Sequence, residues 1–260
     1  MILLLGGTAD TDPIARALVS RGQKVLVSTA TDYPLALPPH RNVERRVGAL
    51  DEETLRHLIT RRGISALVDA THPYAEIIGP MSFAIARDLA IPYFRFLRPQ
   101  TRMIAKAAQV ANNHEEAARI AFSFEKPVLL TVGSKNIGIY IETARRKSLP
   151  VYMRVLNRKA SIDACYAQGV SPEAIVAAKG PFTALENIAL IRRFEIGVLV
   201  TKDSGAAGGM PEKVDAAKET QCSLVVINRP RRKEIDGYSD LESMLSVLFK
   251  TLENAVSCRQ

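Results

Sequence analysis

The sequence predicts an α/β protein built from two doubly wound parallel sheets, and three observations carry this prediction. Short β-rich runs alternate with longer amphipathic segments, as repeated βα units do. The apolar run at residues 2–5 meets Gly6 and Gly7 before a helical pattern begins, as in a buried parallel strand that leads into a helix. The alternation breaks around residues 98–100 and then resumes. We therefore expect two Rossmann-like domains, residues 1–100 and 101–260, that face each other across a central cleft.

The first half of the chain is expected to contain four strands and three helices. Pro13 suits the first turn of a helix, Asp51 is expected to cap the second helix, and Gly63 is expected to end it. The expected strands are residues 2–5, 24–28, 66–69 and 93–96, and the expected helices are residues 14–20, 52–62 and 76–90.

The same alternation continues in the second half. The expected strands are residues 128–131, 151–155, 175–178, 198–201 and 223–227. The expected helices are residues 114–122, 184–194, 211–220 and 240–252. Asn113 and Glu116 resemble a capping box at the start of the first of these helices.

The composition is that of an ordinary globular protein, with 47% hydrophobic and 24% charged residues. The formal net charge is +8, but the basic residues are dispersed and aromatic residues make up only 6%, so we expect no nucleic-acid partner. A small polyanionic ligand, such as a dinucleotide or a polycarboxylate, would account for the charge, and so would a solvated basic surface.

Other classes are excluded by what the sequence lacks. The apolar runs are too short to span a bilayer and the first residues lack a basic leader, so we expect a cytoplasmic protein without a membrane partner. The three cysteines, Cys165, Cys222 and Cys258, are scattered, which argues against a disulfide framework and a metal site. The oligomeric state is left as a monomer or a small homo-oligomer.

The turn after the first strand is the best candidate for a phosphate site. Glycines let a phosphate approach the backbone, and the following helix N-terminus favours an anion. A tight turn without a ligand is the alternative. The second strand ends in small hydroxyl residues, with neither an acidic residue for the ribose nor an arginine directly after it, so NADPH and NADH both stay open. The expected cofactor-binding residues are Gly6, Gly7, Thr8, Asp10, Ser28, Thr29, Ala70, Thr71 and His72.

A dense polar loop, residues 69–75, follows the third expected strand. Its histidine and tyrosine could donate or accept protons in a reaction, or could simply hydrogen-bond and pack. Three expected strand ends in the second half each carry a lysine beside glycine or a hydroxyl residue. A polyanionic ligand would explain all three together, and solvated loop lysines are the alternative for any single one. The expected substrate-binding residues are Arg98, Ser134, Lys135, Arg154, Lys179, Lys202, Ser204, Gly205 and Lys213.

These motifs, in this order, make the chain similar to the precorrin-6A reductase family of cobalamin biosynthesis, including its cobalt-precorrin-6A branch. The resemblance runs from residue 2 to about residue 230. The segments that carry it are LLGGT at 4–8, DATHPYA at 69–75, TVGSK at 131–135, GPF at 180–182 with Glu186 and Asn187, VTKDSG at 200–205 with Gly208, Gly209, Glu212 and Lys213, and INRP at 227–230.

The resemblance implies a nicotinamide-dependent reductase that uses NADPH or NADH and requires no metal. Its substrate would be a tetrapyrrole polycarboxylate, in which one ring C=C bond is reduced to give precorrin-6B or its cobalt form. His72, Tyr74 and Asp203 are the candidate catalytic proton donors, with solvent or the pyrrole nitrogens as alternatives. Aerobic-pathway members often carry an arginine after the second strand, where this chain has residues 29–32, and this difference favours the cobalt branch.

A short-chain dehydrogenase needs a tyrosine with a lysine four residues later, and no tyrosine of this chain has one. A non-catalytic dinucleotide-binding sensor remains the alternative from a different class, although it would not need clustered lysines.

Overall fold

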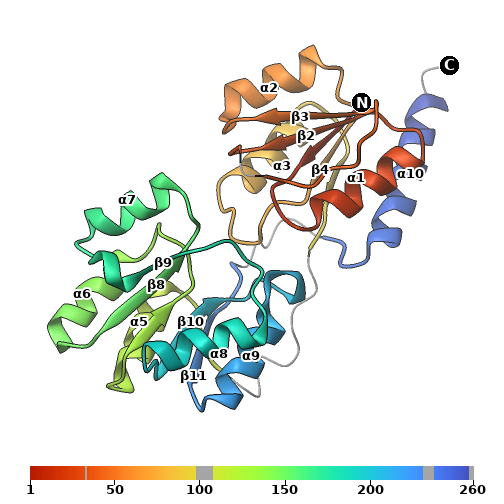
Figure 1. Ribbon diagram of the computed structural model, residues 1–260. Helices are drawn as coiled ribbons and strands as arrows, with labels where there is room; N and C mark the ends of the chain where they lie inside the picture. The colour runs from red at the N-terminus through yellow and green to blue at the C-terminus, as the bar shows by residue number, and fades with distance from the viewer. Residues whose placement is uncertain (33, 98–107, 231–236, 258–260) are drawn as a thin grey trace. The chain divides into compact units, whose positions relative to one another are not determined.

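The computed structural model describes residues 1–32, 34–97, 108–230 and 237–257 (Figure 1). The chain forms two compact units. The first unit contains Met1–Pro99 and Pro230–Gln260, and the second unit contains Gln100–Arg229. In each unit, helices cover both faces of one parallel sheet, so the predicted α/β class with two parallel sheets is confirmed.

The first unit is built on a five-stranded parallel sheet with the order β3-β2-β1-β4-β5. The chain begins at the central strand β1 and continues to β2 and β3 on one side of it. It then crosses to the other side of β1, where it forms β4 and β5. The strands are β1 (Ile2–Leu5), β2 (Val25–Thr29), β3 (Val43–Val47), β4 (Ala66–Asp69) and β5 (Tyr93–Arg95).

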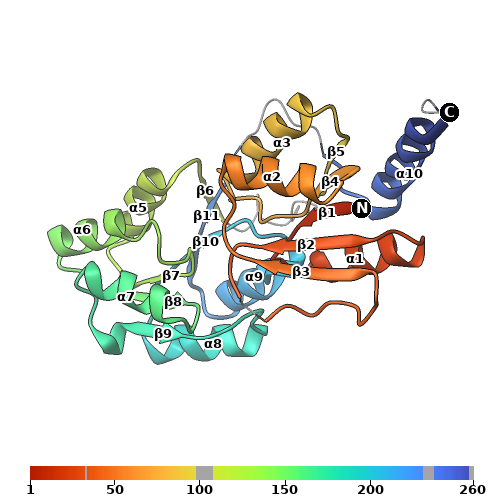
Figure 2. The same ribbon diagram turned by 90° about the horizontal axis from the view of Figure 1, so that it is seen from above.

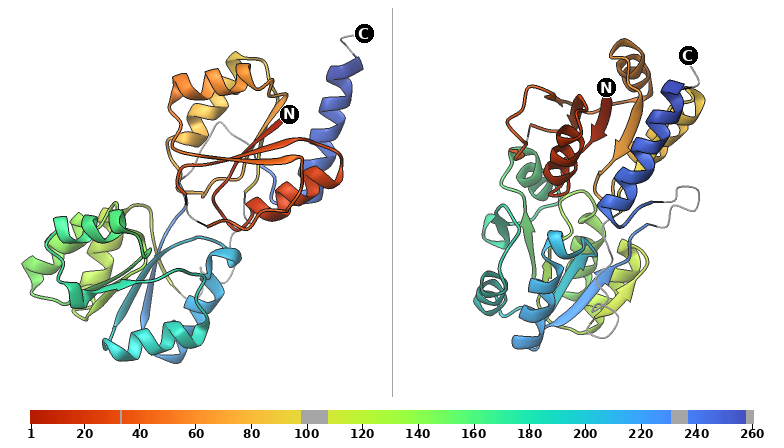
Figure 3. Two further views of the ribbon diagram at one scale, coloured as in Figure 1. Left: turned by 45° about the horizontal axis from the view of Figure 1, so that its top comes forward. Right: turned by 90° about the vertical axis from the view of Figure 1, so that its right-hand side faces the viewer.

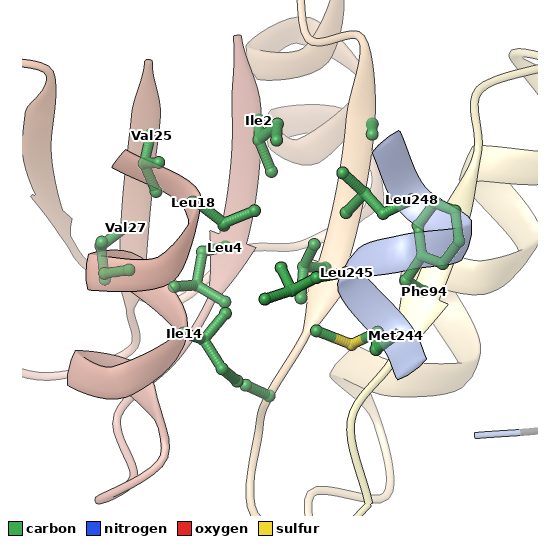
Figure 4. Close-up of a cluster of buried hydrophobic side chains, with 14 of the residues drawn as sticks. Ile2, Leu4, Ile14, Leu18, Val25, Val27, Phe94, Met244, Leu245 and Leu248 are labelled. Carbon is green, nitrogen blue, oxygen red and sulfur yellow. The ribbon is translucent and has the colours of Figure 1, made fainter. Parts of the chain in front are cut away.

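Alternating side chains of these strands face two apolar cores, as the pleat of a buried strand requires. Leu3 and Leu5 pack under α2 (Glu52–Arg61) and α3 (Ile78–Asp88). Ile2 and Leu4 pack under α1 (Thr11–Ser20) and α10 (Leu241–Ser257), as Figure 4 shows. Asp51 caps α2 as predicted, and its side chain accepts a hydrogen bond from the Thr54 amide.

The C-terminal helix α10 belongs to the first unit, so the predicted second domain, residues 101–260, is wrong at its C-terminal end. Met244, Leu245 and Leu248 of this helix are fully buried in the core that contains Ile2 and Leu4. The returning chain also pairs with the end of β5, because the Tyr238 amide donates to Arg95 O at 2.8 Å. Both views of Figure 3 show α10 beside the strands of the first unit.

The second unit has a six-stranded parallel sheet with the order β6-β11-β10-β7-β8-β9. The helices α8 (Ala184–Arg193) and α9 (Met210–Glu219) cover one face (Figure 2). The helices α5 (His114–Ser123), α6 (Gly138–Lys147) and α7 (Lys159–Ala167) complete the unit. The strands are β6 (Gln109–Ala111), β7 (Val128–Leu130), β8 (Val151–Val155), β9 (Ile175–Ala177), β10 (Val198–Lys202) and β11 (Ser223–Ile227).

Among the described residues, two strands and two α-helices were not predicted, and each has a weak pattern. The edge strand β3 has the sequence VERRV, which lacks the apolar run of its neighbours. The edge strand β6 has only three residues, of which two are exposed. The helix α7 buries only Cys165 among its residues, so its amphipathic signal is faint. The helix α6 starts at Gly138 without a side-chain cap.

None of the helices in the described ranges combines the length and apolar character that crossing a membrane would need.

Candidate functional site

The candidate site of the first unit lies where β1 and β4 end side by side. Chain connections leave these two strands in opposite directions, and parallel α/β sheets bind ligands beyond the carboxyl ends of strands at such a point. The predicted cofactor residues of the glycine turn, residues 6–8, follow β1. The predicted residues 70–72 follow β4.

The glycine turn is held in shape by Thr11, a residue that the sequence did not single out. The Thr11 hydroxyl accepts hydrogen bonds from the amides of Gly7 at 3.0 Å and Thr8 at 3.1 Å. A Cβ atom on Gly6 would lie 2.5 Å from Thr11 Cγ2, so only glycine fits there. Gly7 has a φ of +105° and open space around the missing Cβ. The turn is therefore preformed, with the exposed Gly7 at its surface.

The two loops of this site are tied together by Thr8. Its hydroxyl donates to Ala70 O at 3.0 Å, and Asp10 Oδ2 lies 3.4 Å from the same hydroxyl. The Ala70 amide donates in turn to Leu5 O at 2.9 Å. These contacts bring the predicted residues Thr8, Asp10 and Ala70 together at the carboxyl edge of the sheet.

Asp69, the last residue of β4, anchors the polar loop and was missed as a site residue. It is 1% exposed, and its Oδ1 accepts from the amide and the hydroxyl of Thr71 at 2.9 and 2.6 Å. Its Oδ2 accepts from Tyr93 Oη at 2.7 Å. Burial, followed by the negative charge of Asp69, raises the pKa of Tyr93, so this phenol stays protonated and keeps donating.

His72 and Tyr74 lie next to each other on the loop that Asp69 anchors. Their ring centroids are 5.5 Å apart, and both side chains are half-buried. The Tyr74 amide donates to His72 Nδ1 at 3.4 Å. Both predicted proton donors thus occupy the same short stretch after β4.

Two arginines of β3 reach the end of β2, where Ser28 and Thr29 are buried. Arg46 Nη1 donates to Ser28 Oγ at 3.1 Å, and Arg45 Nη2 donates to Thr29 Oγ1 at 3.2 Å. The residues that follow β2 in the chain, 30–32, contain no arginine. Both cations come instead from the unpredicted strand β3, whose register pairs Arg46 with Ser28.

The second unit buries two cations close together. Arg154 of β8 is 6% exposed and Lys213 of α9 is 8% exposed. Burial lowers the pKa of Arg154 to about 10. Burial, followed by repulsion from Arg154, lowers the pKa of Lys213 to about 8. Within the described ranges neither cation forms an ion pair with a carboxylate, although buried charges are normally paired.

Neutral groups hold these two cations in place. Arg154 Nη1 donates to Asn187 Oδ1 at 2.9 Å, and its guanidinium carbon lies 3.9 Å from the centre of the Phe182 ring. Lys213 Nζ donates to Gly208 O at 3.2 Å. Such partners fix the positions of the cations, and the nearby carboxylates of Glu186 and Glu212 offset the effect of burial on the two pKa values only in part. An anionic ligand would complement this arrangement.

Asp203, a predicted catalytic residue, is bound to Arg229 of the same unit. Arg229 Nε lies 3.1 Å from Asp203 Oδ2, and both side chains are almost completely buried. Asp203 Oδ1 accepts from the Gly205 amide at 3.1 Å. Through these contacts Asp203 stabilises the conformation of the loop after β10.

All but one of the remaining predicted substrate residues lie at or just after the carboxyl ends of β7, β9 and β10. Ser204 Oγ donates to Gly208 O at 2.9 Å, and Gly205 has a φ of +71°. Lys135 and Lys179 are exposed, whereas Ser134 and Lys202 are half-buried. Arg98 lies outside the described residues.

Comparison with known proteins adds an independent line of support. Residues 1–248 match the family model described as precorrin-6x reductase CbiJ/CobK. Cobalt-precorrin-6A reductase of Priestia megaterium is 32% identical over 253 residues, which cover 95% of this chain and 98% of that protein. Precorrin-6A reductase of Mycobacterium tuberculosis is 30% identical over 239 residues, which cover 88% of each chain.

The fold comparison agrees with the two parallel sheets described above. The solved structure of CobK precorrin-6A reductase aligns with a TM-score of 0.78 over 96% of each chain, at 22% identity. The family model and the two curated relatives confirm the resemblance inferred from the motifs. Because the family model spans almost the whole chain, the chain belongs to the precorrin-6x reductase family CbiJ/CobK, the reductases of cobalamin biosynthesis.

Proposed function

We propose that the chain binds a reduced nicotinamide dinucleotide through its first unit and a tetrapyrrole polycarboxylate through its second unit. It reduces one ring C=C bond of precorrin-6A or cobalt-precorrin-6A, and the product is precorrin-6B or its cobalt form. The related enzymes named above are reductases of these two compounds. Family membership sets aside the alternative of a non-catalytic dinucleotide sensor.

The proposal of a polycarboxylate substrate rests on the buried cations Arg154 and Lys213. Keeping two like charges inside a protein is unfavourable, and an incoming carboxylate would relieve that cost by replacing their lost hydration. A polycarboxylate offers several such groups. The half-buried Lys202 and the exposed Lys135 and Lys179 are proposed to bind further carboxylates at the same edge of the sheet.

The residues at the first site fit a dinucleotide. Gly6 and Gly7 leave the backbone accessible, and Thr11 holds the turn in place before any ligand arrives. The N-terminus of α1 favours the negative pyrophosphate. Thr8, Thr71 and His72 are proposed to contact the nucleotide from the joined loops, and Asp10, Ser28 and Thr29 to contact its ribose groups.

The reaction adds two hydrogen atoms across one C=C bond. A reduced nicotinamide supplies one of them as hydride, with both electrons, and ends oxidised. The second hydrogen is added as a proton at the other end of the conjugated system. His72 and Tyr74 are proposed as its source, whereas Asp203, held by Arg229, is proposed to position the loop that meets the substrate.

The test is an anaerobic incubation of the protein with metal-free or cobalt-bound precorrin-6A, each with NADH or NADPH. We expect oxidation of the nicotinamide and reduction of the macrocycle in equal amounts, followed by absorbance. Arg154→Gln should raise the KM for the tetrapyrrole about tenfold or more, since a charged hydrogen bond is worth about 1.5–3 kcal/mol.

Arg193→Gln is the matched control, because Arg193 is an exposed arginine in the last turn of α8 and lies over the Phe194 ring. It removes the same charge from the same unit. Turnover that is equally impaired in both variants, or that is missing with all four substrate pairs, would contradict the proposal.

A further inference from the structure

One carboxylate oxygen close to the two buried cations is itself buried and lacks a donor. Glu212 lies in the first turn of α9, and its Oε2 is buried without a hydrogen-bond partner among the described residues. A buried acceptor without a donor is unfavourable, so this oxygen points to a partner outside the protein chain. The next residue, Lys213, has the opposite charge, yet the two side chains form no ion pair in the described part of the chain.

Gly209 faces both of these side chains. A Cβ atom on Gly209 would lie 3.8 Å from Glu212 Oε2, 3.9 Å from Lys213 Nζ and 4.0 Å from Phe182 O. Polar atoms from two segments of the chain therefore surround one position, and Gly209 itself is buried. A buried water typically makes about three hydrogen bonds to polar groups arranged in this way.

The donors and acceptors of these groups match one water molecule. The Lys213 ammonium carries three donors, and among the described residues only Gly208 O, at 3.2 Å, accepts from it. A water can accept from this ammonium and donate its hydrogens to Glu212 Oε2 and Phe182 O. It would supply a donor to the buried oxygen of Glu212 and connect that oxygen to the opposite charge of Lys213.

We propose that a buried water at Gly209 links Glu212 to Lys213, and that Glu212 is a positioning residue that keeps the Lys213 amine positively charged for a substrate carboxylate. This role rests on the proposed function, because it deepens the part given there to Lys213. Burial, followed by repulsion from Arg154, lowers the pKa of Lys213, and the negative charge of Glu212 opposes both effects. Glu212 acts through Lys213, since its own charge would repel a substrate carboxylate.

The charges around Lys213 come from several elements. Arg154 acts on it from β8, and Glu212 acts on it from α9. The other charged groups on neighbouring elements are Glu186 of α8, which acts on Arg154, and the pair of Asp203 and Arg229. Within the described ranges, Glu212 is therefore the carboxylate whose charge favours the protonated form of Lys213.

The test of this role is the pH dependence of kcat/KM for the tetrapyrrole in Glu212→Gln. Without the charge of Glu212, Lys213 should lose its proton more easily, so the fall in kcat/KM should begin about 1 pH unit lower. At lower pH, where Lys213 is charged in both proteins, the KM should be equal or smaller, because one repulsive carboxylate is gone. Glu219→Gln is the matched control, since it removes an exposed glutamate at the end of the same helix, and it should match the unaltered chain at every pH.

The bridging water is tested by Gly209→Ala. The new methyl group would lie at ordinary contact distance from Glu212 and Lys213 and would exclude the water, so kcat/KM should again fall at lower pH. Gly22→Ala is the control, because its φ of +77° matches the +76° of Gly209 and its Cβ meets no atom within 4 Å. The two substitutions introduce similar backbone strain, so a difference between their pH profiles reports on the contacts at residue 209.

An unchanged pH profile in Glu212→Gln or in Gly209→Ala would overturn the inference. So would a KM that Glu212→Gln raises at every pH, because a purely structural role predicts that result.

A further experiment needs no substrate. Urea unfolding at neutral pH compares the effect of Lys213→Met in the unaltered chain with its effect in the presence of Glu212→Gln. We expect Lys213→Met to stabilise the chain more when the carboxylate is absent, and an equal effect in both backgrounds would overturn the inference. Coupling in this experiment without any turnover of the tetrapyrrole would contradict the proposed function while it supports the link between Glu212 and Lys213.

Discussion

The Thr8 hydroxyl donates a hydrogen bond of 3.0 Å to Ala70 O, although the two residues are 62 positions apart in the chain. This bond joins the loop after β1 to the loop after β4, at the point where the first sheet reverses its direction of connection. The glycine turn is therefore joined directly to the loop that carries His72 and Tyr74.

Replacing Thr8 by valine keeps the shape of the side chain and removes this bond. We expect the free energy of unfolding to fall by about 1 kcal/mol, as for one lost hydrogen bond, and the nucleotide Kd to rise severalfold because the loops separate. Thr60→Val is the control, since among the described residues the Thr60 hydroxyl bonds only to Arg56 O within α2. Unchanged nucleotide binding in Thr8→Val would mean that the joined loops do not hold the cofactor.

Gly7 offers a second test, because its backbone conformation disfavours any other residue. Gly7→Ala and Gly22→Ala place a Cβ on backbones with φ of +105° and +77°, and neither Cβ meets an atom within 4 Å. Both variants should lose about 1 kcal/mol of stability in chemical denaturation from backbone strain. Only Gly7→Ala should also weaken NADPH or NADH binding, and Gly7→Val should abolish it with the fold retained.

Lys213 should impose a pH dependence on substrate binding. Its pKa, lowered to about 8 by burial, means that the free protein loses this positive charge as the pH rises through that value. We therefore expect kcat/KM for the tetrapyrrole to fall above about pH 8, whereas Lys213→Arg should keep its activity to higher pH. A profile that is the same in both proteins would show that Lys213 does not bind a substrate carboxylate.

Lys213 is expected to lower the stability of the protein while it favours substrate binding. Lys213→Met removes a buried cation that has no ion-pair partner among the described residues. We expect the free energy of unfolding at neutral pH to rise by about 1 kcal/mol or more, because the lowered pKa measures the cost of that charge. The KM for the tetrapyrrole should rise at the same time. Loss of stability with an unchanged KM would assign Lys213 a purely structural role.

Asp203→Asn separates positioning from proton transfer. The substitution weakens the pair with Arg229 and leaves that guanidinium without its carboxylate, which should lower stability by about 3 kcal/mol. If Asp203 only shapes the loop, the KM should rise while the solvent isotope effect on kcat stays the same. A large fall in kcat with an unchanged KM would instead identify Asp203 as the proton donor.

The strongly patterned parts of the fold could be predicted from the sequence. β1, β4, β8 and β11 are mostly apolar and mostly buried runs with turn residues at their ends, and their predicted bounds match the structure. β3 could not be predicted, because an edge strand with the sequence VERRV shows no buried face. The placement of α10 was also inaccessible, since the βα alternation does not say which sheet a final helix covers.

The residues of the candidate site also differ in how far the sequence pattern could predict them. Loop residues such as Thr8 and His72 could be proposed as site residues because they come directly after predicted strands, and the structure places both at the carboxyl edge of the first sheet. Arg45 and Arg46 were missed because their position depends on the unpredicted strand β3. Thr11 and Tyr93 were missed because each acts through a hydrogen bond to a loop rather than by belonging to a recognisable motif.

The most direct test of the central claim follows the hydride itself. The protein is incubated anaerobically with precorrin-6A or its cobalt form and with a nicotinamide that carries deuterium at the transferable position, and the reduced tetrapyrrole is analysed by mass spectrometry. The account predicts one deuterium per product molecule from the labelled nicotinamide, and one further deuterium only when the reaction runs in heavy water. A reduced product that contains no deuterium from the nicotinamide would contradict it.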